Sequence, residues 1–127
     1  MKNYINIEKL LLIITIDGVY ITFENRKLLQ YNEYNTINHA EIIDYYNIAD
    51  RDCWDVLVFG YKQPFKFNRK YFTKKVLGIL LLSNNNHKIV LKLADKGFSK
   101  KRFNTQLDIY MKEYLNINKL KFKYITL

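Results

Sequence analysis

The carboxylates Asp50, Asp52 and Asp55 come nearest to a metal-binding arrangement in this sequence. Asp-x-Asp spacing can hold a divalent cation through oxygen ligands. No glycine shapes the segment, however, and no fourth oxygen ligand follows at the offset of a calcium loop. We therefore interpret these residues as a solvated turn and predict no metal site.

Groups that could perform catalysis are equally scattered. His39 and His87 lie far apart, and neither has a partner at zinc-ligand spacing. Neither serine, Ser83 or Ser99, lies in a nucleophile elbow, and the 4 glycines form no phosphate-binding loop. No acid, base and nucleophile can be assembled from these residues. We predict a protein that is not an enzyme and needs no cofactor.

The composition indicates one folded domain. The chain has 127 residues, of which 49% are hydrophobic and 16% aromatic, enough to bury a core. The single cysteine, Cys53, cannot form an internal disulfide, which favours a buried thiol in a reducing compartment. The longest apolar runs, Leu10–Ile16 and Val76–Leu82, are too short to cross a bilayer, and no secretory signal precedes them. We expect a cytoplasmic location.

Charge is distributed unevenly along the chain. Between Lys62 and Arg102 there are 12 basic residues and a single acid, Asp95, whereas the 61 preceding residues hold 9 acids and 5 bases. The abundance of Asn, Ile, Lys and Tyr is typical of an AT-rich genome, but such drift does not remove acids from one segment. The asymmetry favours an anionic partner.

Two groups of cations are the candidate binding residues. The first surrounds Pro64 and the segment after it, and the second opens a predicted helix, where cations oppose the helix dipole. The candidates are Lys66, Arg69, Lys70, Lys74, Lys75, Lys100, Lys101 and Arg102. Cations and aromatic residues also alternate over Tyr61–Tyr71, which fits either base stacking or an ordinary strand with its rings in the core.

The first half of the chain predicts antiparallel strands. The run Leu10–Ile16 ends at Asp17-Gly18, and Val19–Glu24 then alternates apolar and polar residues. Asp-Gly between two such runs is a strong hairpin signal. A turn at Asn25-Arg26 leads to a third strand over Lys27–Tyr31, which would complete a meander, and residues 32–39 form a polar loop.

The second half mixes strands with a helix. Gly78 weakens the helical spacing within Tyr71–Leu82, yet a helix is still the favoured interpretation there over a strand. Ser99 is the predicted N-cap of an amphipathic helix that reaches residue 115. The remaining predictions are strands over Glu41–Ile48, Trp54–Tyr61 and Lys88–Leu93, an irregular stretch over Phe65–Asn68, turns at Asp50–Asp52 and Asn84–Asn86, and a closing strand over Lys119–Leu127.

This layout resembles the bacterial pleckstrin-homology-like (PH-like) family. Ile14-Thr15-Ile16-Asp17-Gly18-Val19-Tyr20-Ile21 is similar to the hairpin motif that opens those proteins. Ala40-Glu41-Ile42-Ile43 is similar to their next strand, with His39-Ala40 where the family has tryptophan. The resemblance implies one α+β domain over residues 1–127, a bent antiparallel sheet or partial barrel of PH-like type, with a C-terminal amphipathic helix and a closing strand. It also implies a binding scaffold without catalytic residues.

The leading functional hypothesis is a PH-like binding module that contacts an acidic protein surface or membrane headgroups through its basic second half. One alternative is a small immunity- or antitoxin-like protein that inhibits a partner protein stoichiometrically. A nucleic-acid-binding protein is a further, less favoured alternative. A partner bound by charge should be lost steeply as salt rises, whereas one held by a buried apolar hot spot should not.

Overall fold

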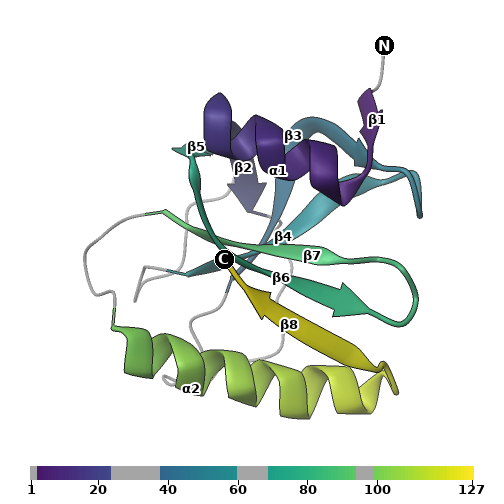
Figure 1. The fold of residues 1–127 in the computed structure, drawn as a ribbon, viewed down its shortest axis with the longest axis vertical. Coiled ribbons are helices and arrows are strands. Elements are labelled where there is room, and N and C mark those ends of the chain that lie inside the picture. The colour runs from purple at the N-terminus through teal and green to yellow at the C-terminus, as the bar shows by residue number, and fades with distance from the viewer. Residues whose placement is uncertain (1–2, 24–37, 60–68, 94–98) are drawn as a thin grey trace.

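A computed structural model describes residues 3–23, 38–59, 69–93 and 99–127 of the chain. Within these ranges, an eight-stranded sheet curls into an open half-barrel, and a helix covers each of its two faces (Figure 1). The elements are β1 (Asn3–Ile5), α1 (Ile7–Ile16), β2 (Val19–Phe23), β3 (Asn38–Asn47), β4 (Cys53–Phe59), β5 (Lys70–Thr73), β6 (Lys75–Leu82), β7 (Lys88–Lys92), α2 (Lys100–Tyr110), a π-helical turn (Met111–Leu115) and β8 (Phe122–Thr126).

The sheet is mixed, not antiparallel as the sequence predicts. Its strand order is β5-β2-β3-β4-β7-β6-β8, and β1 pairs with β3 off this path. The pairs β1–β3 and β4–β7 are parallel, and the others are antiparallel. The α+β partial barrel is therefore present, with two parallel contacts that a meander would not contain.

The prediction of a strand over Leu10–Ile16 and an Asp-Gly hairpin is wrong, because these residues form α1. The Asn6 side chain caps the helix by accepting a hydrogen bond from the Lys9 N–H (2.9 Å), and Leu10 and Ile14, four residues apart, are buried. Asp17-Gly18 ends the helix. Gly18 has a φ of 81°, and its N–H donates to the carbonyls of Ile13 and Ile14. The same dipeptide that favours a hairpin therefore serves here as a helix C-terminus.

The favoured helix over Tyr71–Leu82 is also wrong, because the segment forms β5 and β6, separated only by Lys74. Val76 pairs with Leu91 and Gly78 with Val90, so Leu77 is an extra residue that bulges from β6. The bulge moves Val76 to the core under α1, while Leu80 and Leu82 join the core under α2. Alternation is therefore broken in mid-strand, and the remaining spacing resembles that of a helix.

Other predictions agree with the structure. In β4, Val56 and Val58 face one core and Leu57 faces the other, as the alternation predicts. α2 begins directly after Ser99 and buries Phe103 and Leu107. The strands at β3, β7 and β8 and the turns near Arg51 and Asn85 are present as well.

Some predictions fall outside the described residues. These are the turn at 25–26, the strand at 27–31, most of the loop at 32–39 and the irregular stretch at 65–68. The last two residues of that loop, Asn38 and His39, belong to β3 instead.

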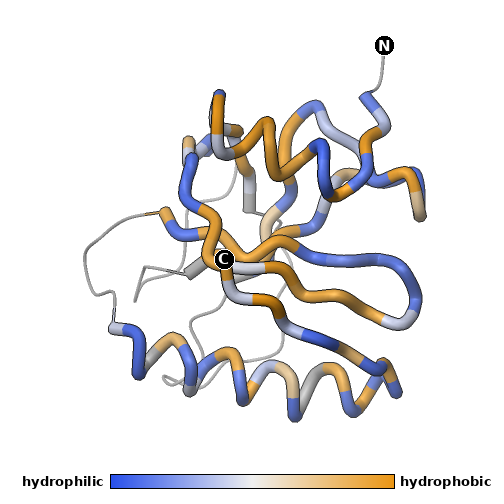
Figure 2. Tube along the Cα trace, viewed as in Figure 1, coloured by the Kyte–Doolittle hydropathy of each residue, from blue (hydrophilic) through white to orange (hydrophobic). Residues whose placement is uncertain are grey.

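The core has two parts, one on each side of the sheet. Leu10 and Ile14 of α1 pack on one face, and Phe103, Leu107 and Tyr110 of α2 pack on the other. Figure 2 shows apolar residues along most of α1, whereas apolar and polar residues alternate along α2. α1 consequently carries more apolar surface than its buried face uses.

Candidate functional site

The first group of predicted binding residues surrounds β5. Arg69, Lys70, Lys74 and Lys75 are exposed, and the Arg69 guanidinium lies 5.4 Å from the centre of the Tyr71 ring. Lys66 lies outside the described residues. Arg69, Lys70 and Lys74 therefore present cations at the β5 end of the strand order, and Lys75 begins β6.

The second group opens α2. Lys100 and Lys101 are exposed there, and Arg102 is in the same turn. α1 and the neighbouring β5 lie toward one end of the molecule and α2 toward the other (Figure 1). The described candidates thus belong to two separate surfaces, of which the one at β5 has the more distinctive surroundings.

Two exposed aromatic rings lie among the cations of β5. Tyr20 and Phe72 are cross-strand partners in β2 and β5, their ring centres are 5.2 Å apart, and they are 54% and 48% exposed. Phe72 approaches Gly18 so closely that a Cβ atom there would lie 2.2 Å from its ring. Lys70, which pairs with Thr22, and Lys74 flank the rings. We call Tyr20, Lys70, Phe72 and Lys74 the Tyr20–Phe72 face.

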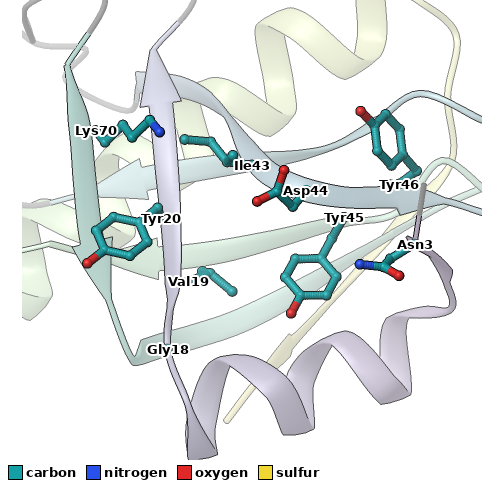
Figure 3. A pocket seen from close by; sticks show the side chains of 9 residues that line it. All are labelled: Asn3, Gly18, Val19, Tyr20, Ile43, Asp44, Tyr45, Tyr46 and Lys70. Atoms are coloured by element: carbon teal, nitrogen blue, oxygen red, sulfur yellow. The ribbon is translucent and has the colours of Figure 1, made fainter. Parts of the chain in front are cut away.

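A pocket adjoins this face where β2 and β3 separate. Their pairing ends at Ile21–Ile42, although both strands continue. On the other side of β3, Glu41 pairs with Asp55 and Tyr46 with Cys53, so the four residues 42–45 stand opposite Trp54 alone. The resulting pocket has a volume of about 780 Å³. Its lining residues are Asn3, Gly18, Val19, Tyr20, Ile43, Asp44, Tyr45, Tyr46 and Lys70 (Figure 3).

Opposite charges line this pocket. Asp44 comes from the bulged part of β3 with a φ of 72°, a left-handed conformation that costs an L-residue roughly 1 kcal/mol or more. In the described part of the chain, neither Asp44 nor Lys70 forms a hydrogen bond or ion pair through its side chain. No partner from these ranges therefore competes with a ligand for either charged group.

The three carboxylates near Cys53 are occupied by local structure. Asp50 accepts a hydrogen bond from the Asp52 N–H (3.0 Å), and Asp52 accepts one from the Cys53 N–H. Asp55 forms an ion pair with buried Lys88 (3.5 Å). Across the ranges that the structure describes, no three His, Cys, Asp or Glu residues are grouped so as to hold a metal ion.

The remaining chemical candidates have structural contacts. His39 Nε2 lies 3.4 Å from the Tyr110 hydroxyl, and His87 Nδ1 accepts a hydrogen bond from the Leu82 N–H (3.0 Å). The Ser83 hydroxyl accepts one from the Lys121 N–H. Burial, together with the charges of Glu41 and Asp52, raises the pKa of the Cys53 thiol. A raised pKa lowers the fraction of reactive thiolate at neutral pH.

The sequence predictions did not include Asp44, Tyr45 or the Tyr20–Phe72 ring pair. One signal was present, since Asp44 interrupts the apolar stretch Ile42-Ile43-Asp44-Tyr45-Tyr46. A charged residue within such a stretch is typical of a bulge or an edge. Tyr20, in turn, occupies an outward position in the alternation of Val19–Glu24.

No helix in the described ranges has the length and apolar character needed to cross a membrane. Comparison of the chain with protein-family models, with curated proteins and with solved structures finds no match.

Proposed function

We propose that this protein is a non-enzymatic binding module that contacts an acidic protein surface through the Tyr20–Phe72 face. The observation that carries the proposal is the exposed pair of rings between Lys70 and Lys74. Exposed aromatic residues are frequent energetic centres of protein interfaces. Cations at the rim steer an acidic partner and increase its association rate.

Exposed apolar residues of α1, which leads directly into β2, also favour a protein partner over a purely electrostatic one. Leu12 and Ile16, one turn apart on α1, are 61% and 65% exposed, and Ile16 lies two residues before Gly18, against which Phe72 packs. A stoichiometric inhibitor of immunity type would use such a surface in the same manner. The PH-like type and a cytoplasmic location are part of the same proposal.

The proposal is tested by partner capture with matched variants. The bait is the full chain with a C-terminal tag, incubated with a lysate of its native host, and bound proteins are identified by mass spectrometry. We compare the wild type with Lys70→Glu/Lys74→Glu and with Tyr20→Ser/Phe72→Ser. Lys121→Glu/Lys123→Glu is the control, because it changes the net charge equally on β8 and the residues before it, outside the face.

We expect the charge reversal to lower the affinity for the partner roughly 30-fold, at up to about 1 kcal/mol for each lost contact. The serine variant should weaken it at least as much, because hot-spot rings contribute about 2 kcal/mol or more. Folding should change little, since each exposed substitution alters stability by less than about 0.5 kcal/mol. The proposal is contradicted if both variants retain the partner, or if the control loses it equally.

Anionic vesicles and a random-sequence oligonucleotide are tested in parallel. A protein partner held by the rings should survive moderate salt, whereas a lipid or nucleic-acid partner should be lost steeply as salt rises. Strong, salt-sensitive binding to either probe, with no captured protein, would replace the proposed partner class.

A further inference from the structure

We propose that the pocket between β2 and β3 binds a small zwitterion of the α-amino-acid class, with Asp44 holding the ammonium group and Lys70 the carboxylate. This site goes beyond the proposed protein-binding face, with which it shares Tyr20 and Lys70. The two can be separated experimentally, because Asp44 lines only the pocket and Phe72 and Lys74 belong only to the face.

The pocket is created by the way three strands meet. Along one edge of β3, β2 pairs with Ala40–Ile42 and β1 pairs with Tyr45–Asn47. Ile43 and Asp44 lie between these two partners. The start of β2, Val19 and Tyr20, pairs only with β5 on its other edge. The hollow therefore lies at a fixed junction of the sheet, where a ligand meets positioned side chains.

Asp44 is in a conformation that the fold would reach more easily with glycine. Its positive φ is unfavourable for a residue with a Cβ atom, although Asp tolerates it better than most. Its carboxylate forms no hydrogen bond or ion pair in the described part of the chain. Residues with an unfavourable backbone conformation cluster at ligand sites, and Asp44 combines such a conformation with a charged group that lines a pocket.

Lys70 supplies the opposite charge. In Figure 3 its ammonium group and the Asp44 carboxylate lie on the two sides of Ile43, and no ion pair joins them. One ligand that carries both an ammonium and a carboxylate can neutralise both groups, whereas an ion of a single charge leaves one of them unpaired.

The rest of the lining favours an apolar or aromatic side chain. Tyr20 and Tyr45 lie on either side of Val19 in Figure 3, and Asn3 adds an amide group. Tyrosine rings offer apolar area together with a hydroxyl. The volume of about 780 Å³ lies in the range of small-molecule sites.

The test is an NMR titration of the ¹⁵N-labelled full chain, with any tag at the C-terminus because Asn3 lines the pocket. The probes are L-phenylalanine, phenethylamine, which lacks the carboxylate, and 3-phenylpropionate, which lacks the amine. The other nineteen amino acids are tested singly at millimolar concentration. We expect L-phenylalanine to shift the amide signals of Gly18–Tyr20 and Ile43–Tyr46, and both analogues to bind at least about tenfold more weakly.

Matched variants assign the two charges. Asp44→Asn and Lys70→Gln should each weaken the binding of L-phenylalanine at least about tenfold. Asp108→Asn on α2 and Lys74→Gln should leave it unchanged. Asp44→Gly should abolish binding while raising the melting temperature, because it relieves the left-handed backbone. A melting temperature that rises together with lost binding cannot come from misfolding.

Two results would overturn the proposal. One is the absence of signal shifts near the pocket with all twenty amino acids. The other is phenethylamine or 3-phenylpropionate binding as tightly as L-phenylalanine, which would leave a site for a single charge. The two proposals can fail independently. The amino-acid titration concerns the pocket and Asp44, and its failure would not contradict the protein-binding face. Partner capture concerns the face, and its failure would not contradict the role of Asp44.

Discussion

The two helices cover opposite faces of one sheet in different ways. On the α2 side, Phe103, Leu107 and Tyr110 are buried against β4, β6 and β7. On the α1 side, Leu12 and Ile16 remain in solvent although Leu10 and Ile14 are fully buried. β2 and β3, which contribute to the core under α1, also separate from each other, and β3 bulges. Rings and charges are exposed on the outward face of β2 and β5, whereas α2 covers its face of β4, β6 and β7, even though β6 also bulges.

This difference is consistent with the proposed binding role of the region around β2, β3 and β5. Irregular backbone and exposed apolar groups are costs to a fold, and proteins retain them mainly where they are used. One glycine packs against an aromatic ring near each helix, Gly78 against Tyr124 on the α2 side and Gly18, at the end of α1, against Phe72. The two glycines therefore offer a direct comparison of how rigid the sides are.

The largest effect is expected on the α2 side, from Gly78→Ala. A Cβ there would lie 2.3 Å from the Tyr124 hydroxyl and 2.6 Å from the Ile125 carbonyl, and the second of these is backbone. Overpacking of this kind costs about 1–3 kcal/mol. Urea denaturation measures the loss, with Lys123→Ala, an exposed change on β8, as the control. An unchanged midpoint would show that β8 can move away from β6 at no cost.

Gly18→Ala on the α1 side should cost less, about 1 kcal/mol. This cost comes mainly from the φ of 81°, because the Phe72 ring is half exposed and can move aside. The same denaturation experiment in a Phe72→Ala background separates the two contributions. If Gly18→Ala no longer lowers the midpoint once the Phe72 ring is absent, the cost comes from contact with a fixed ring and not from φ. Phe72 would then be as tightly fixed as Tyr124, and the expected difference in rigidity would be contradicted.

The smallest effect concerns pH and the β6–β7 turn. Burial lowers the pKa of His87 below its ordinary value of 6.5, and its Nδ1 accepts the Leu82 N–H. The unfolded chain therefore binds the proton more readily than the folded protein. The stabilisation that neutral His87 contributes to the folded protein is complete above pH 6.5. It declines as the pH falls through the lower pKa of the folded state.

The variant His87→Asn keeps a hydrogen-bond acceptor near that position but does not titrate. Urea midpoints of the wild type and the variant are measured between about pH 5 and 8, the range in which histidine titrates. The two midpoints should converge or cross as the pH falls, because only the wild type loses stability. Parallel curves would mean that the hairpin does not depend on the neutral imidazole.

The sequence predicts those elements in which apolar residues recur with the same spacing from one end to the other. β4 alternates without interruption between two cores, and Phe103 and Leu107 of α2 keep helical spacing, so both were predictable. α1 was not, because its β-branched residues and terminal Asp-Gly also fit a hairpin. β6 was not, because its bulge at Leu77 exchanges the two faces in mid-strand.

The candidate site divides in the same way. Charge alone was sufficient to select Lys70 and Lys74, since acids are missing from their segment. Asp44 depends on where β3 exchanges one partner strand for another, and that exchange is set by long-range pairings with β1, β2 and β4. Local sequence carries no record of those pairings, and the pocket could not be predicted from it.

The joint between β5 and β6 has a consequence for how the protein unfolds. β5 is the first strand of the sheet order and β6 the last but one, yet only Lys74 separates them in the chain. The Thr73 hydroxyl fastens this joint by donating to the Lys92 carbonyl of β7 (2.6 Å). Opening one edge of the half-barrel must therefore pull on the strand that holds the other edge. We expect the two sides to lose their structure together, in one cooperative transition, although they differ in packing and in use.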